Sequence, residues 1–185
     1  MALRRPSKGD KLEYFTRQIV YIRPGTFVIF DRVKSRDPIF KKTWLLQAMN
    51  PPAGRAPDLV LTNGRGRLFV QTLLPAEPLV KLYQGDSLYV SGGKLHPPDR
   101  DTGPAPECRV EISPSRPALT DYFLHVLTAG DSSTAGVPEA TVQEQENGFT
   151  LYLGAARFYF EKNSIGGKIE NSGKSFELVN NIADR

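Results

Sequence analysis

Cysteine and histidine are scarce in this sequence of 185 residues, which has one cysteine, Cys108, and two histidines, His96 and His125. A single cysteine excludes an internal disulfide framework and a cysteine-based metal cluster. We expect Cys108 to be a small buried residue of a strand. The two histidines lie far apart in the sequence and have no carboxylate at ligand spacing, so we predict no metal site and no other cofactor.

Long apolar runs are also missing. No segment approaches the ~18 to 20 apolar residues that are needed to cross a bilayer. Residues 1–10 are basic and polar, with no apolar segment behind them. The sequence therefore predicts no membrane partner and no signal peptide in this chain. We expect residues 1–10 to be a disordered basic tail and residues 11–185 to form a single domain.

The charge balance is mildly positive, with a formal net charge of +4 and a pI near 9.2. Such a balance favours acidic partners, either nucleic acid or an anionic sugar polymer. The sequence has no basic recognition helix and no aromatic ribonucleoprotein motif, so we predict no nucleic-acid partner. An acidic polysaccharide is the partner class that we predict.

Short runs rich in Val, Ile, Thr, Tyr and Phe alternate with turn signals, as strands and turns do. Arg23, Pro24 and Gly25 separate the first two runs, where proline and glycine favour a tight hairpin turn. The pattern predicts an all-β fold, an antiparallel two-sheet sandwich of about a dozen short strands. The predicted strands cover residues 12–22, 26–33, 40–49, 59–62, 67–74, 79–83, 87–90, 108–113, 122–128, 140–145, 149–153, 156–161, 168–171 and 175–179.

Alternation of side chains assigns faces to some of these strands. In the run 157–161, Phe158 and Phe160 fall on one side and the polar or amphipathic residues on the other, which predicts a half-buried strand. The runs 19–22 and 27–30 are apolar at successive positions. We therefore expect both faces of these two strands to be covered, with both strands central in the sandwich.

Two long loops, at residues 50–58 and 91–107, interrupt the regular spacing, and loops of this length are often functional. Guanidinium groups suit sulfate and carboxylate oxyanions. We therefore take five basic side chains as candidate substrate-binding residues, with solvated surface charges as the alternative. They are Arg55, Arg65, Arg67, Lys94 and His96. Four tyrosines, Tyr83, Tyr89, Tyr152 and Tyr159, have rings that can stack on sugars, although tyrosines in strands more often belong to the core.

Five phrases in series carry a family resemblance. They are KLEYFTRQIVYIRPGTFVIFDRVKS, KKTWLLQAMNPP, GRGRLFVQTLLP, SGGKLHPPDRDTGPAPECRVEISPS and DYFLHVLTA. In order and spacing, they resemble the later part of the C-terminal β-domain of heparinase II/III-like polysaccharide lyases. The resemblance covers residues 11–129, and the remainder is similar only as further β-rich sequence. Independently of the family, Trp44 and His125 stand in apolar surroundings and are predicted to be core residues.

The resemblance implies a lyase that cleaves glycosaminoglycans or other uronic-acid polymers by β-elimination. That reaction needs a neutralised carboxylate and a tyrosine or histidine within reach of the reacting proton. In the family this machinery is implied to lie in an N-terminal helical toroid and an early His-x-His segment, and this chain has neither. We therefore predict a non-catalytic accessory domain that supports the helical catalytic domain and contacts the sugar chain, in a periplasmic or secreted protein.

Two alternatives stay open: a stand-alone carbohydrate-binding module, and a complete lyase in its own right. Measurable affinity for acidic glycans that falls with added salt is expected of the first. Release of unsaturated uronate is expected of the second. If the sheet has an exposed edge, we further expect a homodimer that forms through it.

Overall fold

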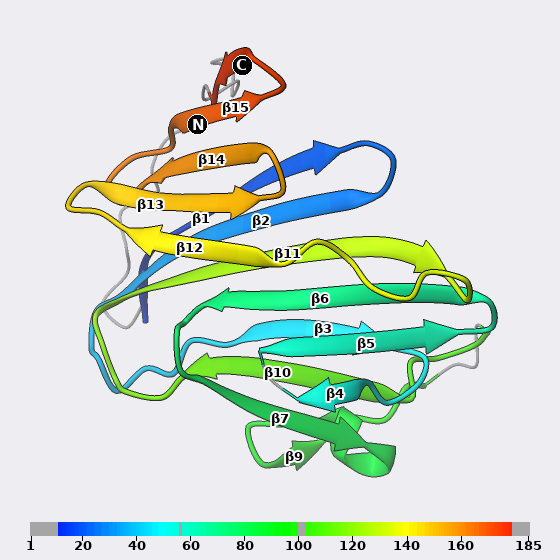
Figure 1. Cartoon of the computed structure of the whole chain (residues 1–185). Helices are drawn as coiled ribbons and strands as arrows, with labels where there is room; N and C mark the ends of the chain where they lie inside the picture. The colour runs from blue at the N-terminus through cyan, green and yellow to red at the C-terminus, as the bar shows by residue number, and fades with distance from the viewer. Residues whose placement is uncertain (1–10, 56, 100–102, 179–185) are drawn as a thin grey trace, which may run out of the picture.

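The centre of the fold is a six-stranded antiparallel sheet (Figure 1). The computed structural model describes residues 11–55, 57–99 and 103–178. The predicted tail at residues 1–10 lies outside these residues. In spatial order the central sheet consists of β1 (Leu12–Ile22), β2 (Thr26–Ser35), β11 (Thr120–Asp131), β6 (Gly66–Leu74), β5 (Asp58–Asn63) and β4 (Ala53–Arg55).

A five-stranded sheet covers one face of the central sheet. Its strands follow one another as hairpins: β12 (Ala140–Glu144), β13 (Gly148–Leu153), β14 (Ala156–Glu161), β15 (Gly167–Asn171) and β16 (Lys174–Glu177). Phe30 of β2 packs between the sheets, with its ring centroid 4.8 Å from that of Phe160 and 5.9 Å from that of Phe149. Each of these rings is almost fully buried, so removal of one should cost about 3–5 kcal/mol.

A three-stranded sheet covers part of the opposite face. It is ordered β3 (Trp44–Ala48), β10 (Cys108–Pro114) and β7 (Pro78–Gln84). Val110 and Ile112 of β10 bury against Val70 and Phe123 of the central sheet. A 3-10 helix, η1 (Gly85–Tyr89), follows β7 and leads to a small hairpin of β8 (Val90–Ser91) and β9 (Lys94–Leu95).

The all-β, antiparallel sandwich that the sequence predicts is confirmed. The structure adds a third layer, because the central strands β2 and β11 are apolar on both faces and each face is covered by another sheet. No helix among the described residues is long and apolar enough to span a membrane.

Some local predictions were wrong. Residues 87–90 form the end of η1 and the start of β8 instead of one strand, and the predicted loop at residues 50–58 contains the short strand β4. The expectation that both faces of residues 19–22 are covered is also wrong. β1 ends the central sheet, and Ile19 and Tyr21 are exposed on one of its faces. The prediction for residues 27–30 of β2 holds in part. Val28 and Phe30 are buried under the five-stranded sheet, but on the opposite face Ile29 is only partly buried and Phe27 is 40% exposed.

Candidate functional site

The five basic residues predicted from the sequence lie in three places. Arg65 is exposed in the turn between β5 and β6, and Arg67 is half-buried at the start of β6. Arg55 ends β4, where its backbone pairs with Asp58 at the other end of β5. Since a strand rises about 3.3 Å per residue, Arg55 and Arg65 are separated by roughly 16 Å along β5. The structure therefore brings together Arg65 and Arg67 and places Arg55 apart from them.

Lys94 and His96 belong to the small hairpin that follows η1. Both are exposed, and the backbone N–H of His96 donates a hydrogen bond to the carbonyl of Tyr89 at 2.8 Å. The hairpin extends from the three-stranded sheet, whereas Arg65 and Arg67 belong to the central sheet. The contact of these residues with a sugar chain stays a prediction.

Arg67 lines a groove of about 340 Å³ at one end of the central sheet, between β3 and the turn from β5 to β6. Leu46, Met49, Leu61 and Leu68 supply apolar walls to this groove. Arg67 Nη1 donates a hydrogen bond of 2.8 Å to the carbonyl of Thr134, so part of its guanidinium is used to hold a loop. The groove is thus mainly apolar, with Arg67 as its one cationic lining residue among the described part of the chain.

His125 lies in the interior, as predicted. Its ring is fully buried, stacks on Trp44 at 4.0 Å between centroids, and shares a hydrogen bond of 3.2 Å with the hydroxyl of Thr72 through Nδ1. Burial, and to a lesser extent the positive charge of Arg17, lower the pKa of His125 from 6.5 to about 3. A fully enclosed imidazole cannot contact a polymer in solution, so His125 acts in the core.

The outer face of the five-stranded sheet gathers a second set of polar and aromatic side chains. In β14, Phe158 and Phe160 point into the core, so alternation places Arg157 and Tyr159 on the outer face. Tyr152 of β13 stands opposite Arg157 in the strand register. Tyr152 and Tyr159 are therefore diagonal neighbours on adjacent strands, about 7–8 Å apart.

The ring of Tyr159 lies close to the sheet surface because Gly148, on the neighbouring strand, has no side chain there. A Cβ atom added at Gly148 would lie 2.4 Å from Cε2 of Tyr159, so the ring occupies the space that a side chain at this position would need. Gly148 lies two residues before Thr150, the partner of Tyr159 in the register. An aromatic ring that covers a glycine of the next strand is a known way of stabilising sheets. The arrangement also leaves a half-exposed ring lying along the surface.

Tyr152 is held by its neighbours. Its hydroxyl donates a hydrogen bond of 3.2 Å to Oε1 of Gln143, and the guanidinium carbon of Arg157 lies 5.6 Å from its ring centroid. On β15, which pairs with β14, Lys168 Nζ and Glu170 Oε1 are 2.9 Å apart. This hydrogen bond raises the pKa of Lys168 and lowers the pKa of Glu170, so both groups stay charged near neutral pH.

Two neighbouring hollows lie on this outer face. One, of about 210 Å³, is lined by Tyr152, Tyr159 and Lys168, and the other, of about 320 Å³, by Lys174 and the turn after β15. Both share Arg157 and Glu170. We call the residues that line the two hollows the tyrosine track. Its lining has three cations and one carboxylate, which gives a local charge of +2 (3 − 1).

The tyrosine track combines flat aromatic surface, amide and hydroxyl groups, and an excess of positive charge. This combination suits a hydroxyl-rich and anionic ligand, because rings contact the apolar faces of sugars while cations and amides bind their oxygens. The sequence indicated that Tyr152 and Tyr159 are able to stack on sugars but favoured a core position. The signal that distinguishes the two is the alternation with Phe158 and Phe160, which already puts Tyr159 outside.

Comparisons with known proteins give a distant structural likeness. No protein-family model and no curated protein matches this sequence. A crystal structure of a mutant heparan sulfate lyase HepC from Pedobacter heparinus is similar with a TM-score of 0.49 and 15% identity, over 84% of this chain and 26% of that chain. Another structure of heparan sulfate lyase HepC from the same organism has a TM-score of 0.47 and 16% identity, over 88% of this chain and 23% of that chain. The chain thus spans about a quarter of the length of these lyases, and likeness at this level assigns no family.

Proposed function

We propose that this chain is a non-catalytic β-module that binds an acidic polysaccharide and accompanies the helical catalytic domain of a uronic-acid lyase. The tyrosine track carries the binding part of this proposal, because two tyrosine rings and a net positive lining lie together on an exposed face. The five phrases of the sequence that resemble heparinase II/III-like lyases support the lyase context. The same resemblance supports a periplasmic or secreted location.

Binding is tested with the isolated chain and acidic glycans: heparan sulfate, hyaluronate and alginate. We expect measurable affinity for at least one of them by titration calorimetry, decreasing as salt is added because the lining is cationic. Replacement of Tyr152 by alanine together with Arg157→Gln should lower that affinity about tenfold, since a stacked ring and a cation each contribute about 0.5–2 kcal/mol.

Tyr83 offers a matched control on the three-stranded sheet. The guanidinium of Arg109 lies 4.7 Å from its ring centroid, so the pair has the same chemistry as Tyr152 with Arg157 but lies outside the track. Tyr83→Ala should leave the affinity unchanged. Equal losses in the two variants, or no binding of the unaltered chain to any of the three glycans, would refute the tyrosine track as the binding site.

The basic residues predicted from the sequence define a second arm of the same experiment. Arg65→Gln with Arg67→Gln should reduce affinity only if the sugar chain also reaches the groove beside β3. An effect confined to these two residues, with the track variant unaffected, would move the site to that groove. The candidates Arg55, Lys94 and His96 are tested in the same way, one variant at a time.

The absence of catalysis is tested separately. Incubation of the chain with the three glycans, followed through the ultraviolet absorbance of unsaturated uronate, should show no turnover. Turnover by the isolated chain would replace the accessory role with that of a complete lyase. If the chain binds glycan but shows no association with a helical lyase domain supplied in trans, the reading as a stand-alone carbohydrate-binding module is favoured.

A further inference from the structure

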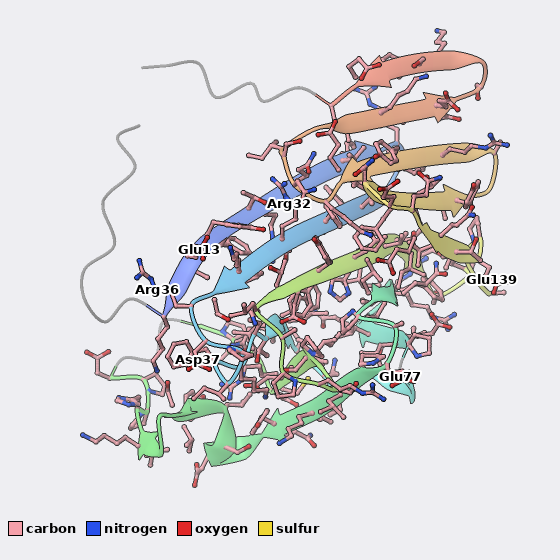
Figure 2. The ribbon with its side chains drawn as sticks, turned by 90° about the vertical axis from the view of Figure 1, so that its left-hand side faces the viewer. Glu13, Arg32, Arg36, Asp37, Glu77 and Glu139 are labelled. Atoms are coloured by element: carbon pink, nitrogen blue, oxygen red, sulfur yellow. The ribbon has the colours of Figure 1, made fainter. Side chains whose placement is uncertain are left out.

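β1 carries an uncovered apolar surface at the margin of the molecule. Figure 2 shows this strand, with Glu13 on it, at the edge of the central sheet. Phe15, Ile19 and Tyr21 alternate along one face and are 49%, 59% and 52% exposed. Phe27 of β2 is 40% exposed, and its ring stacks on Tyr21 with centroids 4.7 Å apart. These four side chains, here called the β1 strip, expose more apolar surface than scattered surface residues do.

The layers of the fold explain why this surface is bare. Val20 and Ile22, on the opposite face of β1, pack against the core under the five-stranded sheet. Gln18 on that face donates a hydrogen bond of 3.2 Å to the carbonyl of Gly166. The β1 strip lies on the side of the three-stranded sheet, whose described contacts with the central sheet extend to Ile29 and Val33 of β2 and do not include β1. Among the described residues, one face of β1 is therefore covered by another sheet and the other is not.

The outer backbone edge of β1 is also unusually long. β1 has 11 residues, whereas the other strands that end a sheet of three or more strands, β4, β3, β7, β12 and β16, have between 3 and 7. Short edges, lysines and prolines protect natural sheets from pairing with other chains. Residues 12–22 contain neither lysine nor proline. Among the described sheets, the longest edge therefore has no lysine or proline to block pairing, and its one irregularity is a register shift between Leu12 and Tyr14.

We propose that β1 pairs antiparallel with β1 of a second copy of this chain, centred on Gln18. In this register Phe15 of one copy stands opposite Tyr21 of the other, which makes two aromatic cross-strand pairs. Glu13 stands opposite Arg23 of the other copy, just beyond the strand end, which adds two opposite-charge pairs. The central sheets of the two copies then form one continuous sheet.

Neighbouring registers are less complementary. Pairing centred on Arg17 places two guanidinium groups opposite each other, which like-charge repulsion disfavours. Pairing centred on Ile19 places Phe15 opposite Arg23 and gives Glu13, which Lys34 of its own copy binds at 2.9 Å, no second cation from the other copy. In the Gln18 register Arg17 stands opposite Ile19 of the other copy and keeps its two hydrogen bonds of 2.7 Å to Asp31 of its own copy. Charge and aromatic pairing therefore select one register.

A cysteine at the proposed two-fold centre tests this register directly. In a Gln18→Cys variant the two introduced thiols face each other on the half-buried face of β1, so mild oxidation should link two chains directly. A Thr16→Cys variant is the matched control, because its half-buried thiol lies on the same face of β1 as Gln18 but faces Val20 of the other copy, so the linked fraction should be several-fold lower. The natural Cys108 is fully buried and does not compete. Equal cross-linking of the two variants would overturn the register.

Sedimentation equilibrium tests the association itself. The unaltered chain should show a dimer whose fraction rises with concentration, and Ile19→Lys should abolish it by placing a cation opposite Arg17 of the other copy. Leu45→Lys, at a residue 54% exposed on β3, should leave the dimer intact. A monomer at every concentration, or equal loss in the two lysine variants, would refute the proposal. This proposal does not depend on the proposed function, because the tyrosine track that we propose for glycan binding lies on the five-stranded sheet and not on β1.

Discussion

A fall in pH from 7 to 4 should destabilise the folded chain by about 3 kcal/mol through His125 alone. The imidazole is fully buried, and protonation would require an acceptor at both ring nitrogens. Nδ1 contacts Thr72, but Nε2 has no hydrogen-bond partner among the described residues. These conditions disfavour the charged ring, whose pKa falls to about 3 in the folded chain.

The sign and size of the effect follow from proton linkage. The unfolded chain binds a proton at His125 near pH 6.5, whereas the folded chain binds it only near pH 3. The stability is therefore complete above pH 6.5 and is lost as the pH falls toward 3. Between pH 6 and 4.5 the slope rises from about 1.0 to about 1.3 kcal/mol per pH unit, because His125 of the unfolded chain is about three-quarters protonated at pH 6 and almost fully protonated at pH 4.5.

Urea unfolding at several pH values, followed by tryptophan fluorescence, measures this slope. Trp44 is the single tryptophan of the chain and stacks on His125, so the probe reports the relevant part of the core. In a His125→Asn variant, which keeps a polar atom near Thr72, we expect lower stability at pH 7 but a flat profile between pH 6 and 4.5. The lowered carboxyl pKa values of Asp131 and Glu170 act at lower pH, below their ordinary values. A slope that persists in the variant would refute the assignment to His125.

The remaining predictions concern a buried charge and a backbone contact. Arg17→Met should lower the free energy of unfolding by about 1–3 kcal/mol in urea titrations, because Asp31, only 2% exposed, loses its cation, and a further Asp31→Asn should recover most of this loss. No recovery would contradict the charge argument. Gly167→Ala should cost at least about 3 kcal/mol in thermal unfolding, because its Cβ would lie in contact with the carbonyl of Tyr159 at a positive φ of 140°. Gly173→Ala, at positive φ with open space around it, should cost only about 1 kcal/mol, and equal costs at the two glycines would refute the steric explanation.

Part of the candidate site was accessible from the sequence. The alternation in residues 157–161 separates the inward phenylalanines from Arg157 and Tyr159, and this separation is what the structure shows. The pairing of Tyr152 with Arg157 across a hairpin, and of Tyr159 with Gly148 on the neighbouring strand, depends on register. A shift of one residue would turn every side chain to the other face. The register of these strands therefore had to be taken from the structure, because the sequence alone does not determine it.

The sequence alone determined the strands, most of their turns and the all-β class, because a two-residue period and the placement of glycine and proline act over a few neighbouring residues. Only the tertiary structure decided which sheet each strand joins, that Arg55 and Arg65 lie at opposite ends of β5, and that β1 lies at an edge. Apolar residues on both faces of β1 predicted a central strand, yet no layer formed by the described residues covers one of these faces. Burial depends on what packs from distant parts of the chain or from another molecule, and local sequence does not contain that information.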